Sequence, residues 1–220
     1  MRASPRAVLF DLDGTLIDTA ADFVAVLNQL LTRHQREVLP FARIRETVSD
    51  GARALVQLGF GIDESAAEFE SLRLELLALY QTQLTVHTRL FEGMDAVLAH
   101  LDQRDIPWAI VTNKPQAYTD PLLRALDLHQ RCRIAVCPDH VSQRKPDPEG
   151  LLLACRHLGC PPESAIYLGD HRRDIEAGRN ARMPTVACRY GYIHADDDIE
   201  SWRADFIVDT PADIMTLLPR

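Results

Sequence analysis

The sequence predicts an α/β fold, with a doubly wound parallel-sheet core and a helical cap inserted into it. Residues 87–220 alternate short apolar stretches, typical of buried strands, with amphipathic stretches, typical of helices. This alternation favours a parallel sheet whose strands are joined by helical crossovers. A separate apolar strand at residues 8–10 precedes a region, residues 18–86, that shows only helical periodicity. We therefore predict a core of residues 1–17 and 87–220 and a cap of residues 18–86.

The predicted cap begins with a helix over residues 18–34, for which Asp18 or Thr19 can serve as the N-cap. Residues 40–86 continue the helical pattern, with glycines near the middle marking a break. Most strands of the predicted core are followed by a helix, as a doubly wound sheet requires. The core periodicity predicts helices over residues 94–101, 116–126, 148–158, 175–181 and 211–218 and strands over residues 107–111, 133–136, 165–168, 185–188 and 206–208.

The composition is that of an ordinary globular protein, with 46% hydrophobic and 25% charged residues among 220. The formal net charge of -8 argues against binding to nucleic acid, although a local site can still attract an anion. No apolar stretch approaches the roughly 18 residues of a membrane span, and the first residues show no secretory leader. We expect a cytoplasmic protein, a monomer or a homodimer, with no membrane partner.

The cysteine content indicates reduced thiols, because the number is odd and no Cys-x-x-Cys pair occurs. A zinc site built from the two wider cysteine pairs is the less favoured alternative, since structural zinc sites usually have tighter pairs or histidines. The cysteines are Cys132, Cys137, Cys155, Cys160 and Cys188.

Two aspartates, Asp11 and Asp13, directly follow the first predicted strand, and Gly14 allows the chain to turn away from it. Two carboxylates 4 Å apart repel each other by about 4 kcal/mol at an effective dielectric constant of 20. A metal ion, or a proton on one carboxyl group, would offset this repulsion. Considered alone, an ordinary Asp-Gly turn is the simpler interpretation of this stretch.

Polar residues occur at three further places where predicted core strands or loops end. They are Thr112 with Asn113, Lys145, and Asp170 with Asp174. The carboxyl ends of parallel strands meet at one edge of a sheet, so we expect these residues to approach Asp11 and Asp13 there. Each group alone could be a helix cap or a turn. Their joint occurrence in this order predicts a functional site.

In this order the four stretches resemble the motifs of the haloacid dehalogenase superfamily of phosphohydrolases. The cap lies between the first and second motifs, which is the position of the superfamily's type 1 helical caps. The chain is similar to phosphoglycolate phosphatases, and several loops are similar to those of bacterial N-acetylmuramic acid 6-phosphate phosphatases, which act in peptidoglycan recycling. The four stretches are Asp11-Leu12-Asp13-Gly14-Thr15, Ile110-Val111-Thr112-Asn113, Lys145-Pro146 and Gly169-Asp170-His171-Arg172-Arg173-Asp174.

The resemblance implies a Rossmann-like core and a Mg²⁺-dependent phosphatase that hydrolyses a small-molecule phosphate ester. Asp11 would be the nucleophile and would form an aspartyl-phosphate. Asp13 would be the acid and base, protonating the leaving alcohol and then deprotonating the attacking water. Dehalogenases of the superfamily lack this second aspartate, so Asp13 favours a phosphatase.

The resemblance also implies a metal site and a phosphate site. Mg²⁺ would be bound by the Asp11 carboxylate, the Asp13 backbone carbonyl and the Asp170 carboxylate. Asp174 would orient the metal's water molecules or Lys145. The phosphate would be bound by the hydroxyl group of Thr112, the backbone N–H of Asn113 and the charge of Lys145.

We expect the cap to select the substrate. Gly51 allows close approach of the backbone to a ligand, and Arg53 could bind a substrate carboxylate with two hydrogen bonds. The alternative is a helix start with a solvent-exposed arginine. His171, Arg172 and Arg173 are bulkier and more basic than the residues that often follow this motif. They would either narrow the space for the leaving group or attract anions, and the alternative is that they are ordinary surface residues.

Two other functions remain open at the level of sequence. A sugar-phosphate mutase shares both aspartates but returns the phosphoryl group to a sugar hydroxyl. It needs cap residues that hold a second sugar phosphate, and we find no clear set of them. A non-catalytic binding module on the same scaffold is disfavoured because every position that the chemistry needs is present.

Overall fold

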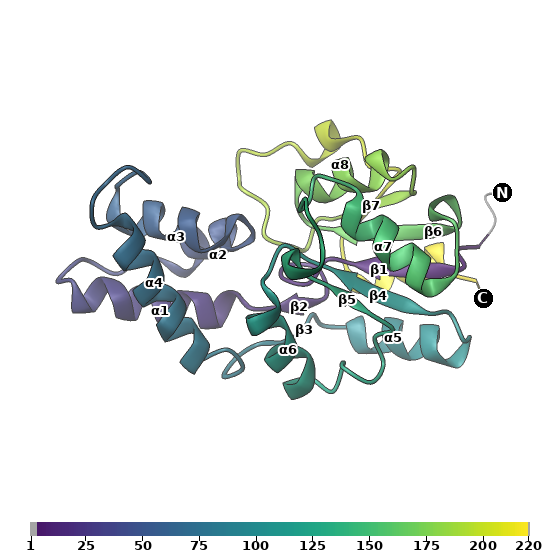
Figure 1. The fold of residues 1–220 in the computed structure, drawn as a ribbon, viewed down its shortest axis with the longest axis horizontal. Coiled ribbons are helices and arrows are strands. Elements are labelled where there is room, and N and C mark those ends of the chain that lie inside the picture. Colours follow the sequence, from purple (N-terminus) through teal and green to yellow (C-terminus); the bar gives the residue numbers. More distant parts are fainter. Residues whose placement is uncertain (1–3, 220) are drawn as a thin grey trace.

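The structure is a computed structural model that describes residues 4–219, and its centre is one sheet of six parallel strands (Figure 1). The strands lie in the order β5-β4-β1-β6-β7-β8. Because β1 lies between β4 and β6, the strands that lead to Asp11, Thr112 and Asp170 are neighbours. The predicted doubly wound α/β fold is confirmed. The strands are β1 (Ala7–Phe10), β4 (Trp108–Val111), β5 (Ala135–Val136), β6 (Ala165–Gly169), β7 (Thr185–Cys188) and β8 (Phe206–Val208).

Helices cover both faces of the sheet, because side chains alternate between the two faces along each strand. Val8 and Phe10 of β1 pack in the hydrophobic cluster that contains residues of α5 and α6, whereas Leu9 packs in the cluster that contains residues of α7 and α8. The polar strand ends are therefore held between two packed layers. These helices are α5 (Met94–Gln103), α6 (Gln116–Ala125), α7 (Glu149–Leu158) and α8 (Arg172–Asn180).

Four helices form the helical cap at the end of the molecule farthest from the chain termini (Figure 1). They are α1 (Ala20–Arg33), α2 (Phe41–Thr47), α3 (Gly51–Phe60) and α4 (Phe69–Thr82). A short antiparallel pair, β2 (Ile17–Asp18) and β3 (Arg89–Leu90), joins the cap to the core, and no sequence pattern indicated it. The boundaries at residues 17/18 and 86/87 stay predictions, and residues 1–3 and 220 of the predicted core lie outside the described residues.

Three helical segments differ from the expectation. The pattern over residues 40–60 is broken by a 3₁₀ turn, η1 (Val48–Asp50), because Gly51 takes a positive φ of 83°. Helix α8 begins at Arg172 rather than at residue 175, because His171 and Asp174 cap its first turn. The last segment, η5 (Pro211–Leu217), is a 3₁₀ helix, and Leu218 before Pro219 is extended.

The remaining 3₁₀ turns are η2 (Pro138–His140), η3 (Pro162–Ser164) and η4 (Ile199–Trp202). The cysteine side chains are free thiols, as expected. Within residues 4–219, no helix combines the length and the apolar character that crossing a membrane requires.

Candidate active site

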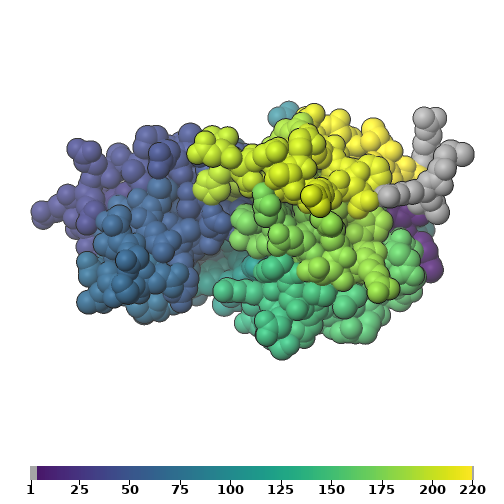
Figure 2. Space-filling view, turned by 90° about the horizontal axis from the view of Figure 1, so that it is seen from above, coloured from purple at the N-terminus to yellow at the C-terminus, as the bar shows by residue number. Residues whose placement is uncertain are grey.

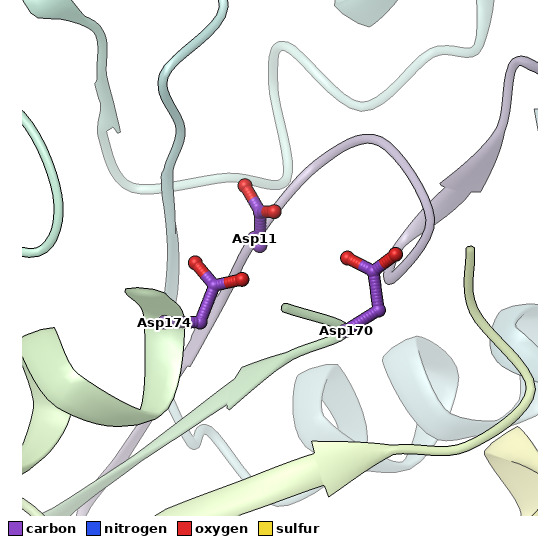
Figure 3. A group of neighbouring side chains, drawn as sticks. All are labelled: Asp11, Asp170 and Asp174. Atoms are coloured by element: carbon purple, nitrogen blue, oxygen red, sulfur yellow. The ribbon is translucent and has the colours of Figure 1, made fainter. Parts of the chain in front are cut away.

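Three carboxylates meet at the carboxyl edge of the sheet (Figure 3). Asp11 follows β1, Asp170 follows β6, and Asp174 lies in the first turn of α8. One oxygen from each lies within 4.8 Å of the others, and all three residues are buried. The strand ends thus bring together residues that are more than 150 positions apart in the sequence, as the parallel sheet predicted.

Lys145 pairs with two of these three carboxylates. Its Nζ is 2.7 Å from Oδ1 of Asp11 and 2.7 Å from Oδ1 of Asp174. The same ammonium group donates to the carbonyl oxygen of Val111 at 3.0 Å and to the hydroxyl oxygen of Tyr167 at 2.8 Å. All of its hydrogen-bonding capacity is therefore used inside the protein, which a buried charge requires.

The charges in this group are not balanced, because Lys145 pairs with Asp11 and Asp174 but has no such contact with the third buried carboxylate, Asp170. Burial raises the pKa of Asp11 to about 7 against the pull of Lys145, and the nearby Asp174 and Asp170 add to the rise. Burial and the charge of Asp174 also raise the pKa of Asp170. Burial opposes the charge of Asp174 as well, but Lys145 and Arg173 outweigh it and lower the pKa of Asp174. The surroundings of Asp11 and Asp170 thus oppose the ionised form of both carboxyl groups when no cation is bound.

A hard divalent cation fits this imbalance, since carboxylate oxygens are the donors that Mg²⁺ prefers. Asp11 and Asp170 are the two side chains that we predicted as ligands, and the structure places them together. The Asp174 oxygens belong to the same cluster but accept hydrogen bonds from Tyr167 and from the backbone N–H of His171. Asp174 is therefore closer to the candidate metal position than we predicted, while its contacts still suit a supporting role.

Glycine is required where the first loop passes Asp170. Gly14 has a φ of 82°, and a Cβ atom there would overlap the Asp170 carboxylate. The carboxylate accepts hydrogen bonds from the Thr15 hydroxyl group at 3.2 Å and from the backbone N–H of Tyr192 at 2.8 Å. These contacts fix the orientation of Asp170 before any ligand arrives.

Asp13 lies apart from the three carboxylates and has a cation of its own. Its Oδ1 accepts hydrogen bonds from the Thr19 hydroxyl group at 2.7 Å and from Nζ of Lys114 at 3.0 Å. The Asp13 side chain is 15% exposed, against 8% for Asp11, whereas the Lys114 side chain is 7% exposed. Lys114 is a residue that the sequence motifs did not single out. The two aspartates of the first loop are thus held by two different lysines.

Thr112 and Asn113 support the neighbouring loops. The Thr112 hydroxyl oxygen accepts the backbone N–H of Lys114 at 3.1 Å, which leaves its proton free to be donated to a phosphate oxygen. The Asn113 side chain accepts the backbone N–H of Lys145 and donates to the Lys145 carbonyl oxygen, each at 3.1 Å. The structure therefore gives the Asn113 side chain a positioning task that the sequence did not indicate.

The cap contacts the core beside Asp170. The Ser49 hydroxyl group donates to Oδ2 of Asp170 at 2.9 Å, and Asp50 lies 3.1 Å from His171 and 2.8 Å from His194. Burial opposes the charge of Asp50, but these two histidines and Arg173 lower its pKa to about 2. Figure 2 shows the yellow-green segment around residue 194 extending onto the purple and blue cap.

The basic residues after Asp170 mostly serve this contact. His171 faces Asp50, and Arg173 donates to the Ser49 carbonyl oxygen while its Nε is buried without a hydrogen-bond partner. Arg172 instead contacts Ser201 and Asp197 within the core.

The cap residues predicted to read the substrate are placed differently. Arg53 pairs with Glu64 of the cap, and its side chain is 52% exposed. This matches the alternative of a solvent-exposed arginine, so the carboxylate-binding role of Arg53 has no contact that supports it. A Cβ atom added at Gly51 would have no other atom within 4 Å, so open space, rather than crowding, surrounds this glycine.

Comparison with known proteins assigns the family. The sequence profile of the haloacid dehalogenase-like hydrolases matches residues 8–188. The chain belongs to this family.

Within the haloacid dehalogenase-like hydrolases, the chain is similar to relatives that are named as phosphatases. The chain is 46% identical to an N-acetylmuramic acid 6-phosphate phosphatase of Pseudomonas putida, over 97% of this chain and 96% of the relative. It is 41% identical to a phosphoglycolate phosphatase of Xanthomonas campestris, over 94% of this chain and 93% of that protein. The predicted class of enzyme, a phosphoric monoester hydrolase, is thereby confirmed.

A solved structure confirms the fold of the family. The crystal structure of a predicted phosphoglycolate phosphatase from Haemophilus somnus superposes with a TM-score of 0.86. It covers 99% of both chains at 24% sequence identity. At this identity the similarity concerns the arrangement of sheet, helices and cap.

The buried carboxylates of this hydrolase lead to an expected pH dependence of stability. Without metal, the folded chain keeps a proton on Asp11 up to about pH 7, whereas an ordinary aspartate loses it near 3.8. Between these values the folded state binds more protons than the unfolded state. Metal-free stability should therefore fall as the pH rises through this window, by up to about 1.4 kcal/mol per pH unit from this group.

Unfolding in a chelator, with wild type compared against Asp11→Asn, isolates this component because asparagine does not titrate. Added Mg²⁺ should stabilise the wild type more at about pH 8 than at about pH 5, since protons compete for the same oxygens. Parallel pH profiles for the two proteins without metal would contradict the assignment of this titration to Asp11.

Proposed function

We propose that this haloacid dehalogenase-like hydrolase removes the phosphate group from a small phosphate ester by way of an aspartyl-phosphate on Asp11. The observation that carries the proposal is the pairing of each loop aspartate with its own lysine. Asp11 is joined to Lys145 inside the buried group, and Asp13, whose side chain is more exposed, is joined to Lys114. The two carboxylates therefore have different surroundings, as a nucleophile and an acid/base require.

In the first step, a carboxylate oxygen of Asp11 forms a bond to phosphorus while the bond from phosphorus to the ester oxygen breaks. Asp13 gives a proton to the departing oxygen, which leaves as an alcohol. Lys145 and the Thr112 hydroxyl group stabilise negative charge on the transferring phosphoryl group. In the second step, Asp13 takes a proton from water as the water oxygen bonds to phosphorus. The Asp11–phosphorus bond then breaks, and inorganic phosphate leaves.

Mg²⁺ is the metal that the donor set favours, with Asp11, Asp170 and the backbone carbonyl of Asp13 as the proposed ligands. When bound, it would neutralise negative charge on the phosphate and on Asp11. Asp174 would keep Lys145 in place beside Asp11, because the Lys145 ammonium group is 2.7 Å from both carboxylates.

N-acetylmuramic acid 6-phosphate is the substrate that we favour, because the Pseudomonas putida relative with this name matches 97% of the chain at 46% identity. The second candidate is 2-phosphoglycolate, supported by the relative from Xanthomonas campestris at 41% identity. Both candidates carry a carboxylate besides the phosphate. Arg173 is closer to the three carboxylates than Arg53 is in its contacts, since Arg173 lies where cap and core meet whereas Arg53 pairs with Glu64 of the cap.

A substrate panel tests this choice. With Mg²⁺ and Asp11→Asn as the blank, we expect kcat/KM for N-acetylmuramic acid 6-phosphate to exceed that for 2-phosphoglycolate and for unrelated sugar phosphates by at least about tenfold. Release of inorganic phosphate into water separates a phosphatase from a mutase. A higher kcat/KM for 2-phosphoglycolate would overturn the substrate assignment, and an isomerised sugar phosphate without phosphate release would overturn the phosphatase itself.

A further inference from the structure

Lysine is used in only two places in this chain, and both are at the active site. The chain has two lysines, Lys114 and Lys145, and every other residue in its Lys and Arg total is an arginine. Lys145 belongs to a sequence motif of the family, but Lys114 follows the motif Thr112-Asn113 and takes no part in the chemical steps proposed above. Burying an ammonium group costs free energy, so a buried lysine that has no assigned function needs an explanation.

The surroundings of Lys114 come from the cap as well as from the core. Its Nζ donates to Oδ1 and Oδ2 of Asp13 at 3.0 and 3.3 Å and to the hydroxyl oxygen of Tyr80 at 2.8 Å. It also lies over two aromatic rings, 4.6 Å from the centre of the Tyr80 ring and 5.0 Å from that of Phe23. Asp13 is a core residue, whereas Phe23 is in α1 and Tyr80 is in α4 of the cap.

The rings of Phe23 and Tyr80 form a buried, stacked pair. They are stacked with their centres 4.0 Å apart and an angle of 14° between their planes, and both residues are buried. The Lys114 ammonium group lies beside this stack, close enough to both ring centres for cation–π attraction. The position of the Lys114 ammonium group thus depends on where the cap helices sit, while its backbone is tied to the core through Thr112.

We propose that Lys114 is a positioning residue for Asp13, and that Tyr80 and Phe23 of the cap set its position. Seating of the cap on the core then orients the acid/base, so proton transfer to the leaving group is efficient only when the cap is in place. A lysine suits this task because its ammonium group is compact and can contact a carboxylate, a hydroxyl group and aromatic rings at once. The inference rests on the acid/base role proposed for Asp13.

Two kinds of phosphate ester distinguish an effect of Lys114 on the positioning of Asp13 from an effect on phosphate binding or folding. An alkyl ester needs a proton on its leaving oxygen, whereas p-nitrophenyl phosphate leaves as a stable phenolate without one. The ratio kcat/KM reports on steps up to departure of the leaving group, so it is independent of the later attack by water. We expect Lys114→Met to lower kcat/KM about 100-fold for the best alkyl ester of the panel and less than about threefold for p-nitrophenyl phosphate.

Tyr80→Phe tests the contribution of the cap with little risk to folding, because it removes only the hydroxyl group that accepts from Lys114. We expect kcat/KM for the alkyl ester to fall about fivefold to tenfold, again with a smaller effect on p-nitrophenyl phosphate. Tyr118→Phe is the matched control, since the Tyr118 ring lies 5.9 Å from the Tyr80 ring but beyond the Lys114 contact. It should leave both kcat/KM values within about twofold of wild type.

Chemical labelling gives a readout that does not depend on activity. An amine-reactive reagent has two lysine targets in this protein, and Lys145 serves as the internal reference. Tyr80→Ala should speed labelling of Lys114 relative to Lys145 by about tenfold or more, because it removes a side chain that shields the Lys114 ammonium group from the reagent.

Each arm can overturn the proposal. An equal fall in kcat/KM on both esters would show that Lys114 acts on phosphate binding or on folding. Unchanged kcat/KM on the alkyl ester would show that it has no role. Unchanged relative labelling in Tyr80→Ala would show that the cap does not set its position. Hydrolysis of p-nitrophenyl phosphate by the wild type, with the Asp11→Asn blank inactive, keeps a failure here separate from a failure of the proposed function.

Discussion

Asp11→Asn is expected to lower turnover by at least about 10⁴-fold. Asparagine has nearly the shape of aspartate, but its neutral amide cannot attack phosphorus or bind a metal as strongly. Removing the carboxylate also removes one member of a cluster of three buried acidic groups, of which only Asp11 and Asp174 pair with the Lys145 ammonium group. The variant should therefore be at least as stable as the wild type without metal, and Mg²⁺ should raise its melting temperature less.

Steady-state release of phosphate and thermal unfolding with and without Mg²⁺ check this result together. Loss of turnover in a variant that unfolds at or above the wild-type temperature places Asp11 in the chemistry. If turnover falls only in proportion to a loss of folded protein, or if substantial turnover remains, Asp11 is not the nucleophile.

Lys145→Met should have the largest effect on stability among substitutions at this site. Methionine fills a similar volume but leaves the Asp11 and Asp174 carboxylates buried without their shared partner. Breaking a buried ion pair from one side costs about 3–5 kcal/mol. Turnover should fall as well, because the positive charge of Lys145 would no longer face the transferring phosphoryl group. Denaturant unfolding in the presence of a chelator measures the loss of stability.

A second substitution separates the two effects. Lys145→Met combined with Asp174→Asn removes one unpaired carboxylate, so part of the lost stability should return while turnover stays low. Loss of stability in Lys145→Met below about 1 kcal/mol, with no recovery in the double variant, would contradict the charge balance described for Asp11, Asp174 and Lys145.

The polar strand ends could be predicted from the sequence because each follows a short apolar stretch, and parallel strands put such ends at one edge. Asp11 and Asp170 meet for this reason, although 159 positions separate them. The start of α8 was harder to predict from the sequence, because the pattern of apolar residues begins at Ile175 while the capping side chains of His171 and Asp174 start the helix earlier.

The roles of residues at the contact between cap and core could not be predicted in the same way. Lys114 lies next to a predicted motif, yet its task depends on Phe23 and Tyr80, which reach it from two cap helices. Arg53 appeared suited to a ligand from its neighbours in sequence, but the loop that carries Glu64 folds back to meet it. The small number of lysines was the one signal in the sequence that could have indicated Lys114.

The stereochemistry at phosphorus tests most directly whether Asp11 forms a covalent intermediate. A phosphorothioate analogue of the substrate, made chiral at phosphorus with one heavy oxygen isotope, is hydrolysed in water that carries the third oxygen isotope, and the configuration of the released thiophosphate is determined. Two successive in-line displacements, first by Asp11 and then by water, each invert the configuration, so we expect net retention. Net inversion would show direct attack by water and would contradict the role of Asp11 as the nucleophile.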